Sequence, residues 1–379
     1  MTDRAPKSLY VHVPFCEGKC RYCDFYSVVP SPGAIGRYLD ALRVEIDLVQ
    51  PQASGTFETV YIGGGTPTVL AEAELAELLA VVRDAFEIAT DAEVTVEANP
   101  GTLSVAKLRV LKDCRVNRLS IGAQSFEDRL LRILGRRHRA GEITDALEAA
   151  RAEGLTNLSL DLIFGVPTQT VADWMHDLEK LLTCDVPHVS TYSLTYEKGT
   201  PLADALERGE LTRVDEEDDL RMYETVIDTL AANGYDHYEI SNFARPGFAC
   251  RHNEVYWANA SYLGLGPSAV SYLDGERRRN VASVEAYAER LGTGALPVDF
   301  AERLDAERRA RETVVMNLRR TRGINVAAFR RHTGFDVLRL VARELEVLSR
   351  QELVAVDEET ICLTRRGRMV ADTVLSELV

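Results

Sequence analysis

Residues 8–25 read SLYVHVPFCEGKCRYCDF, a strand-like run that leads directly into three cysteines. Apolar and polar residues alternate in the first part of this stretch, which predicts a β-strand. Cys16, Cys20 and Cys23 follow with the spacing C-x3-C-x2-C, and Phe25 stands where a fourth cysteine could sit. Because functional loops of α/β folds follow the carboxyl ends of parallel strands, we expect these thiols to lie at one edge of a sheet.

A unit of strand, polar loop and amphipathic helix recurs from this stretch to about Thr195. Strands are predicted over residues 8–15, 59–65, 93–99, 118–124, 157–165 and 188–195. Helices are predicted between them, for example over 73–86 and 142–154. Alternating strands and helices predict parallel strands joined by right-handed crossovers. Six units predict an α/β fold with a partial (β/α)6 barrel, because a closed barrel would need two more units.

The pattern changes after Thr195. A helix is predicted over 215–233 and a strand with a turn over 235–247, whereas residues 250–275 are rich in aromatics, Gly and Asn and show little periodicity. From about residue 300, helices and a hairpin over 352–364 resemble a small winged-helix module. We therefore expect a barrel over residues 1–200, a barrel extension over 201–300 and a C-terminal helical, winged-helix-like domain over 301–379.

Composition and charge favour a soluble globular protein and argue against nucleic-acid-binding, membrane-spanning and disulfide-rich proteins. The 379 residues are 46% hydrophobic and 27% charged, as in soluble globular proteins. The formal net charge of -15 would repel nucleic acid, so we expect no nucleic-acid partner. No apolar run is long enough to cross a bilayer, and the first residues lack the apolar core of a secretory signal. The seven cysteines do not form a disulfide framework, so we expect a protein of the reducing cytoplasm.

The three clustered cysteines are candidate metal ligands. A structural zinc site takes four ligands, usually from paired short motifs, and the chain has no second C-x-x-C pair. An iron–sulfur cubane has four irons, so three thiolates would leave one iron open to a small molecule. The spacing therefore favours a [4Fe-4S] cluster with one open coordination position, and a zinc-stabilised barrel is the alternative.

Residues in the other strands, at their carboxyl ends and in the loops after them are candidates for the same site. Gly63, Gly64 and Gly65 follow the second strand and would let backbone approach a ligand, with an ordinary tight turn as the alternative. Carboxylate and amide groups suit ribose hydroxyls and an amino group, and an arginine suits a carboxylate. These groups are carried by Glu97, Gln124, Asp161 and Arg136, of which the last could also belong to a basic loop.

Four motifs place these residues in a known context: YVHVPFCEGKCRYCDF, YIGGGTPT, LSIGAQSF and DLIFGVPTQT. Together they resemble the radical S-adenosylmethionine (SAM) superfamily and, within it, the oxygen-independent coproporphyrinogen III oxidase family. The resemblance implies a radical SAM barrel with a [4Fe-4S] cluster on Cys16, Cys20 and Cys23, whose open iron is chelated by SAM. It implies SAM contacts at Tyr10, Tyr22, Gly64, Gly65, Thr66, Glu97, Gln124, Arg136, Asp161 and Thr195.

The chain departs from the oxidases at two places. Phe25 stands where they carry a fourth cysteine, and only a few residues precede Ser8, where they carry an extension that helps to shape the substrate site. Both features resemble the shorter, haem-chaperone branch of the family, as does the H-N-x-x-Y-W motif formed by His252, Asn253, Tyr256 and Trp257. That resemblance implies haem binding with His252 as the candidate ligand. A hydrogen-bonded structural histidine is the alternative, and Cys250 is a second candidate ligand.

The expected function is a haem chaperone that binds a [4Fe-4S] cluster, SAM and haem and passes haem to an acceptor protein, which could itself be membrane-associated. The alternative is an oxygen-independent coproporphyrinogen III oxidase, which would bind a porphyrinogen and convert coproporphyrinogen III to protoporphyrinogen IX by radical oxidative decarboxylation. Phe25 argues against the oxidase, and the sequence leaves open whether the protein is an enzyme.

Overall fold

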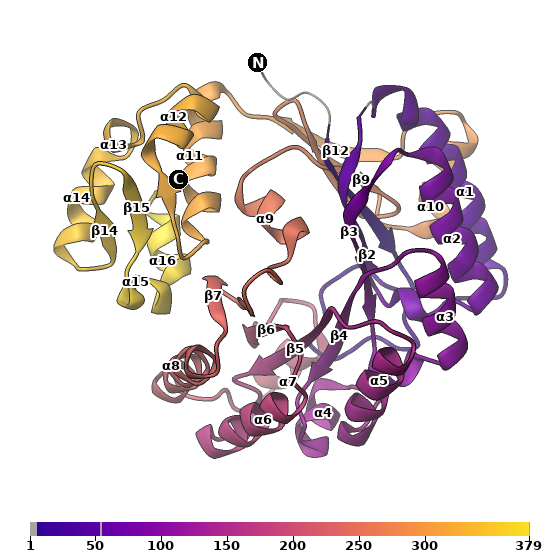
Figure 1. Cartoon of the computed structure of the whole chain (residues 1–379), viewed down its shortest axis with the longest axis horizontal. Coiled ribbons are helices and arrows are strands. Elements are labelled where there is room, and N and C mark those ends of the chain that lie inside the picture. The colour runs from indigo at the N-terminus through magenta and orange to yellow at the C-terminus, as the bar shows by residue number, and fades with distance from the viewer. Residues whose placement is uncertain (1–5, 54, 379) are drawn as a thin grey trace.

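A curved sheet forms the centre of the larger part of the molecule. The computed structural model describes residues 6–53 and 55–378. Within these residues, nine strands form one sheet in the order β7-β8-β6-β5-β4-β3-β2-β1-β9. The parallel strands that form the body of the barrel are, in chain order, β1 (Ser8–Val13), β2 (Phe57–Gly64), β3 (Ile88–Ala98), β4 (Arg118–Gln124), β5 (Leu158–Phe164) and β6 (His188–Ser193). Figure 1 shows the sheet curving into an open barrel with helices along its outer side.

The connections between these strands are helical, as the sequence predicts. The helices that follow β1 to β5 are α1 (Ala34–Val49), α2 (Glu72–Ala85), α3 (Val105–Asp113), α4 (Asp128–Leu134), α5 (Ala140–Ala152) and α6 (Val171–Thr183). Three short 3-10 turns accompany them: η1 (Gln50–Gln52), η2 (Pro67–Val69) and η3 (Pro100–Thr102). The predicted partial (β/α)6 barrel is therefore confirmed.

Alternation along the strands separates an apolar outer face from a polar interior. In β4, Leu119 and Ile121 are fully buried in the apolar core beneath the helices, whereas Ser120, Gly122 and Gln124 line a cavity inside the barrel. Period-2 alternation puts successive side chains on opposite faces of a strand. The polar residues within the strands are thus directed to the barrel interior, where a ligand could meet them.

The edges of the sheet differ from the sequence expectation. Residues 235–247 form a hairpin of β7 (Asp236–Glu239) and β8 (Asn242–Ala244), which joins β6 in antiparallel orientation. β9 (Leu263–Leu265) adds a parallel strand beside β1. The prediction of a single strand and a turn over 235–247 therefore missed β8, and no strand was predicted where β9 lies. Strands of three or four residues are too short for a readable period.

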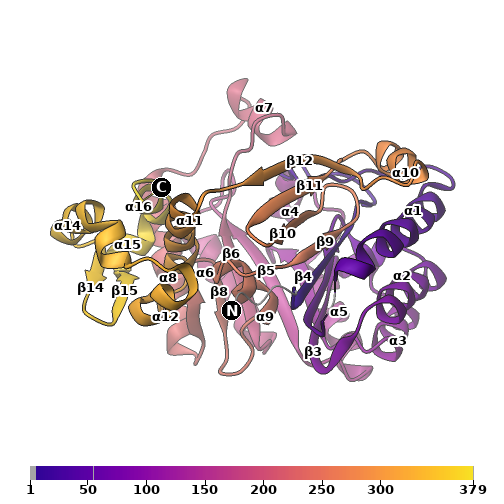
Figure 2. The same cartoon turned by 90° about the horizontal axis from the view of Figure 1, so that it is seen from above.

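The rest of the chain forms an extension and a C-terminal unit, which Figure 2 shows beside the barrel. The extension contains α7 (Pro201–Glu207), α8 (Glu216–Ala232), α9 (Arg251–Trp257), β10 (Val270–Leu273), β11 (Glu276–Asn280), α10 (Val284–Gly292) and β12 (Val298–Arg303). The C-terminal unit contains α11 (Ala306–Leu318), β13 (Ile324–Asn325), α12 (Val326–Thr333), α13 (Val337–Leu340), α14 (Ala342–Arg350), β14 (Val354–Val356), β15 (Thr360–Leu363), α15 (Arg365–Met369) and α16 (Ala371–Ser376).

The C-terminal unit has an apolar core of its own. Val314, Phe329, Leu348 and Ile361 are buried in it, and β13, β15 and β14 form a small antiparallel sheet beside the helices. The expected C-terminal helical domain is confirmed. No helix in the described part of the chain is long and apolar enough to span a membrane.

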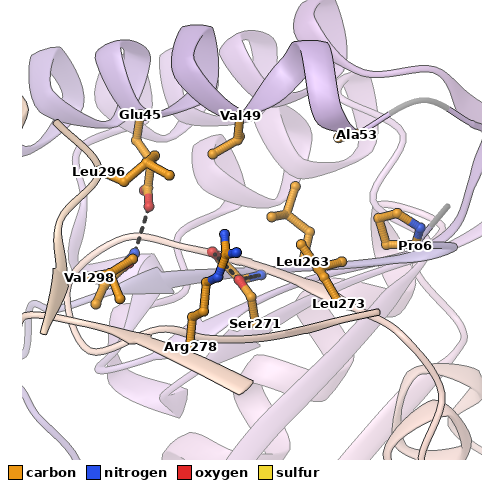
Figure 3. A pocket seen from close by; sticks show the side chains of 12 residues that line it. Pro6, Glu45, Val49, Ala53, Leu263, Ser271, Leu273, Arg278, Leu296 and Val298 are labelled. Atoms are coloured by element: carbon orange, nitrogen blue, oxygen red, sulfur yellow. Dashed lines mark hydrogen bonds between the residues drawn. The ribbon is translucent and has the colours of Figure 1, made fainter. Parts of the chain in front are cut away.

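A buried carboxyl group fastens the extension to the barrel. Glu45 of α1 is 2% exposed and accepts hydrogen bonds from Gly266 N (2.8 Å), Asn280 Nδ2 (2.6 Å) and the Tyr287 hydroxyl (2.5 Å). Figure 3 shows Glu45 pointing from α1 toward the strands of the extension, across a small pocket. Burial raises the pKa of Glu45 to about 7. One side chain thus ties α1 to three segments of the extension, which lie more than 200 positions away in the sequence.

Replacing Glu45 by alanine is expected to lower the free energy of unfolding by about 3 kcal/mol, because three buried donors lose their acceptor. The loss should be larger at pH 5 than at pH 8. A carboxyl whose pKa is raised by folding contributes stability that is lost as the pH rises from its unfolded value toward 7. Urea unfolding at the two pH values measures both effects. Asp47→Ala, at an exposed position on the same helix, is the control, and an equal loss in both variants would contradict the anchoring role.

Candidate functional site

A cavity of about 450 Å3 opens at the carboxyl ends of the parallel strands. Its wall combines the cysteine loop after β1, the glycine loop after β2 and residues at the ends of β3, β4, β5 and β6. The volume is within the range of pockets that bind small molecules and cofactors. Strand ends that lie far apart in the sequence thus converge on one mouth, as the barrel topology predicts.

The cysteine loop is held in place by backbone hydrogen bonds to neighbouring segments. Cys16 N donates to Val28 O (3.0 Å), and Arg21 N donates to the O atom of Leu134 (2.9 Å), the last residue of α4. Leu202 N of α7 donates to Arg21 O (2.9 Å). The loop is therefore fixed at both ends and in its middle by contacts that do not need a metal.

All three cysteines of this loop are partly exposed, reduced thiols that line the cavity. Among the residues that the structure describes, no three His, Cys, Asp or Glu side chains lie close enough together to bind one metal ion. A cubane does not require such a group, since each thiolate binds a different iron. Burial raises the pKa of the Cys23 thiol to about 11, so cluster assembly must displace its proton.

Arg136 joins the cysteine loop to two other strands. Its guanidinium donates to Asn99 Oδ1 (2.5 Å), Gly122 O (2.6 Å) and Cys20 Sγ (3.5 Å). Its Nε is buried and has no acceptor within the described residues. This arginine therefore belongs to the cavity wall and not to an exposed basic loop. The guanidinium has a donor to spare for an anionic ligand.

Glu97 is held by two donors from the neighbouring strand. Its carboxylate accepts from the Tyr61 hydroxyl (2.7 Å) and from Gly64 N (3.0 Å). Burial raises its pKa to about 7. A Cβ atom on Gly63 would lie 2.8 Å from this carboxyl group, and one on Gly64, whose φ is +106°, would lie 2.5 Å from the His12 ring. The glycines are thus required by contacts inside the protein itself, a reason that the sequence did not reveal.

Binding of a ligand that donates hydrogen bonds to Glu97 is expected to weaken below about pH 7, because protonation removes a charged acceptor. For SAM, we expect affinity to fall by up to about tenfold per pH unit there. Glu97→Gln should bind more weakly at pH 8 and lose most of this pH dependence. Equilibrium dialysis with labelled SAM measures the effect. Glu197→Gln, at an exposed carboxylate on the rim, is the control. If SAM affinity of Glu97→Gln depended on pH as strongly as that of wild type, Glu97 would not be the titrating contact of SAM.

Two further predicted residues occupy strained or tightly bonded positions. Gln124, the last residue of β4, has a φ of +67°, which is rare for a residue with a side chain. Asp161 of β5 accepts from the hydroxyls of Ser120 (3.2 Å) and Ser159 (3.4 Å), and burial raises its pKa. Backbone strain of this kind is typically kept at functional sites.

The structure brings together most of the predicted residues. The following line the one cavity: Cys16, Cys20, Cys23, Tyr22, Gly64, Gly65, Thr66, Glu97, Gln124, Arg136, Asp161 and Thr195. Tyr10 is not among them. Its hydroxyl is bonded to His12 Nδ1 (3.1 Å) and its ring stacks on that of Tyr61, with 6.2 Å between centroids. Tyr10 therefore supports the residue that holds Glu97, and its direct contact with SAM stays a prediction.

His252 lies in α9 and is not among the residues that line this cavity; it contacts Thr59, near the amino end of β2. Its Nδ1 is bonded to Thr59 Oγ1 (2.8 Å) and its Nε2 to the Tyr256 hydroxyl (2.9 Å), and the residue is 1% exposed. Burial, with the nearby charge of Arg118, lowers its pKa to about 3. Both ring nitrogens are thus occupied in a neutral imidazole. Haem ligation by His252 stays a prediction that would require one of these bonds to open.

Sequence reasoning missed several side chains of the site. Tyr61 and Ser120 were not singled out, although they hold Glu97 and Asp161. Tyr192, 42% exposed, lines the rim. The available signal was the strand alternation, since Tyr61 faces the same side as Gly63 and Ser120 faces the same side as Gly122. Phe25 also lines the cavity and is 64% exposed, so an aromatic ring occupies the rim beside the thiols.

Family models and curated relatives place this chain among radical SAM proteins and heme chaperones. The model of the radical SAM superfamily matches residues 10–181, and that of the HemN C-terminal domain matches residues 304–370. The heme chaperone HemW of Bacillus subtilis (strain 168) is 36% identical, over 97% of this chain and 98% of its own length. The heme chaperone HemW of Mycobacterium tuberculosis (strain ATCC 25618 / H37Rv) is 38% identical, over 99% and 95%.

A solved structure agrees with these relatives in fold. The coproporphyrinogen III oxidase HemN from Escherichia coli, described as a radical SAM enzyme, superposes with a TM-score of 0.86 at 25% identity. The match covers 99% of this chain and 90% of that chain. The barrel and the C-terminal domain therefore both have counterparts in a known structure.

Proposed function

The chain belongs to the radical SAM superfamily and, within it, to the family of the heme chaperone HemW, and from that premise we propose that it is a haem carrier. It binds a [4Fe-4S] cluster and SAM in the barrel cavity, binds haem, and transfers haem to an acceptor protein. The observation that carries the proposal is the cavity, in which three thiols and a set of charged and amide side chains meet at the ends of six strands.

The donor groups of the cavity fit a cluster and SAM. Cys16, Cys20 and Cys23 supply three soft thiolate ligands, the usual ligands of iron–sulfur clusters. Arg136 suits the carboxylate of SAM, and Glu97 suits its hydroxyl or amino donors. The remaining proposed contacts are Tyr22, Gly64, Gly65, Thr66, Gln124, Asp161 and Thr195. In this superfamily a reduced cluster supplies the electron for cleavage of SAM.

We assign a role to each part of the chain. Residues 1–200 hold the cluster and SAM, residues 201–300 extend the barrel and contribute the haem-binding segment, and residues 301–379 form the C-terminal domain. α9 is fixed between these parts, since Asn317 Nδ2 of α11 donates to Trp257 O (3.1 Å). We propose a cytoplasmic location, from the reduced thiols, and an acceptor that could be associated with a membrane.

His252→Ala is expected to weaken haem binding by at least about tenfold, because an axial ligand is lost. The hydrogen bond between His252 Nε2 and the Tyr256 hydroxyl allows a second variant to test the same prediction. Tyr256→Phe removes the partner of His252 Nε2 without changing the ring of Tyr256, so it should release the imidazole and strengthen haem binding. Absorbance titration with haem measures both. Equal haem affinity in the two variants would show that His252 is a structural residue and would move the search to Cys250.

The alternative function is that of a coproporphyrinogen III oxidase. The similarity of the fold to that of HemN supports this alternative. The position of Phe25 weighs against it, because a phenyl ring stands at the rim in place of the fourth thiol of the oxidases. Anaerobically reconstituted protein with SAM, a reductant and coproporphyrinogen III decides the matter. We expect no protoporphyrinogen IX. Sustained formation of protoporphyrinogen IX would contradict the proposed haem carrier and show that the protein is an oxidase.

A further inference from the structure

The helix α9, which carries the H-N-x-x-Y-W motif, lies between the barrel and the C-terminal unit (Figure 1). On the barrel side, His252 is bonded to Thr59. On the other side, Trp257 O accepts from Asn317 Nδ2 of α11 (3.1 Å), and the Arg319 guanidinium lies 4.8 Å from the centroid of the Trp257 ring. The motif proposed to bind haem is therefore in direct contact with side chains of the C-terminal unit.

An ion pair crosses this contact and begins inside the motif. Glu254 occupies the first variable position of the motif, two residues after His252. Its carboxylate pairs with Arg322, and its Oε2 lies 3.9 Å from Arg320 Nη1. Both arginines belong to the segment that follows α11. We call Arg320 and Arg322 the arginine pair, and these two cations share the one carboxylate of Glu254.

Arg320 is oriented but incompletely bonded. Its side chain is 12% exposed, and its Nε is buried without an acceptor among the described residues. Its Nη2 donates to Asn317 Oδ1 (2.6 Å), the residue that also bonds to Trp257. Burial, with the nearby charge of Arg322, lowers the pKa of Arg320. A guanidinium binds a carboxylate best through two short parallel hydrogen bonds, which Glu254 does not provide to Arg320.

Two neighbours add buried donors of the same kind. Trp257 Nε1 and Arg319 Nε are buried and have no acceptor within the part of the chain that the structure describes. Buried polar groups in proteins normally have partners, and an unpaired donor costs free energy until a ligand or water completes it. The donors at this contact therefore suit a ligand with carboxylate oxygens. Haem is such a ligand, because its propionate groups lie at one edge of the macrocycle.

We propose that the arginine pair binds a propionate of haem and that Glu254 occupies this site in the haem-free protein. The inference rests on the proposed function, because it needs haem as the ligand. It adds the polar groups that hold the edge of the macrocycle and gives the C-terminal unit a part in binding. When haem binds, its propionate replaces the Glu254 carboxylate on Arg320 and Arg322, so one carboxylate is exchanged for another. No covalent bond changes.

The two sides of this ion pair should act in opposite directions on haem affinity. The state in which Glu254 occupies the arginine pair does not bind a propionate there, so loss of the Glu254 charge should strengthen haem binding. Loss of the arginine pair should weaken it, because the charged donors of the propionate disappear. An ion pair that only supports the fold would give effects of the same sign from either side.

The test compares Glu254→Gln with the double variant Arg320→Gln/Arg322→Gln by absorbance titration of the full-length, reconstituted protein with haem. We expect Glu254→Gln to bind haem at least about threefold more tightly than wild type. The double variant should bind haem at least about tenfold more weakly. Arg322→Gln alone changes a side chain that is 67% exposed, and it should also weaken haem binding. This single variant keeps the test valid if the double variant does not fold.

Matched controls carry the same changes of charge elsewhere in the C-terminal unit. Glu346→Gln is the control for Glu254→Gln, and Arg330→Gln/Arg331→Gln is the control for the double variant; all three control positions are exposed. Haem affinity of both controls should stay within about twofold of wild type, as is usual for surface substitutions. Thermal unfolding should confirm that every variant is folded.

Haem dimethyl ester identifies the group that the arginine pair recognises. Its propionates are esterified and offer no carboxylate, so Glu254→Gln and the arginine variants should bind the ester as wild type does. Wild-type haem affinity in these variants would overturn the inference and leave the proposed function intact. Equal weakening of haem and ester binding in the arginine variants would also overturn it, by showing that the pair only supports α9. Absence of saturable haem binding by the wild type would contradict the proposed function itself, and this inference with it.

Discussion

Serine in place of Cys16, Cys20 or Cys23 is expected to abolish assembly of the [4Fe-4S] cluster. Iron and sulfide content after anaerobic reconstitution should fall below about a tenth of the wild-type value, because each thiolate is the protein ligand of one iron. The cluster chromophore, followed by absorbance, should disappear with them. This is the largest effect that the site predicts, since the loop offers three ligands and no replacement.

The fold should survive these substitutions. Backbone bonds such as Arg21 N to Leu134 O hold the loop, and they do not involve the thiols. Thermal unfolding of the cluster-free proteins should therefore stay close to wild type. Cys114→Ser and Cys362→Ser, at partly exposed thiols elsewhere, are the matched controls and should keep full iron content. A loop variant that retains the full cluster would remove that residue from the ligand set.

Arg136→Lys is expected to weaken SAM binding by about a hundredfold. The guanidinium bonds to Asn99, Gly122 and Cys20 at once, and a single ammonium group on a different stem cannot reproduce this geometry. Loss of charged hydrogen bonds of this kind costs about 1.5–3 kcal/mol each. Isothermal titration of reconstituted protein with SAM measures the effect.

The control for this prediction is the neighbouring residue. Arg137→Lys keeps the charge at an exposed position and should bind SAM as wild type does. Iron content of both variants must be checked, because Arg136 also contacts Cys20. Equal SAM affinity in the two variants would show that Arg136 only supports the cavity wall.

The sequence predicted the barrel because its evidence is local. Each of the strands β1 to β6 is a run of at least six residues followed by a helix. The apolar face of such a helix is readable in the sequence, as in α2, where Leu75, Leu78 and Val82 are buried as expected. β8 and β9 escaped prediction because they have three residues each. Glu45 gave no signal at all, since its partners lie more than 200 positions away in the chain.

The residues that line the cavity were also predictable from local sequence, because they lie at the ends of the predicted strands. Residues at the carboxyl ends of strands, such as Glu97 and Gln124, line the cavity as the topology requires. What lies beneath them was not predictable. Tyr61 holds Glu97 through a contact across two strands, and the His252 ring lies 5.1 Å from that of Tyr61. A sequence motif identifies His252 as a candidate ligand, but it does not show whether the ring nitrogens of His252 already form hydrogen bonds inside the protein.

The central claim is that this barrel serves haem delivery. A haem titration of the anaerobically reconstituted protein, followed by absorbance with and without SAM, tests it most directly. The account predicts saturable binding of one haem per chain by a protein that also retains its iron–sulfur chromophore. Absence of saturable haem binding, in protein with a complete cluster, would contradict it.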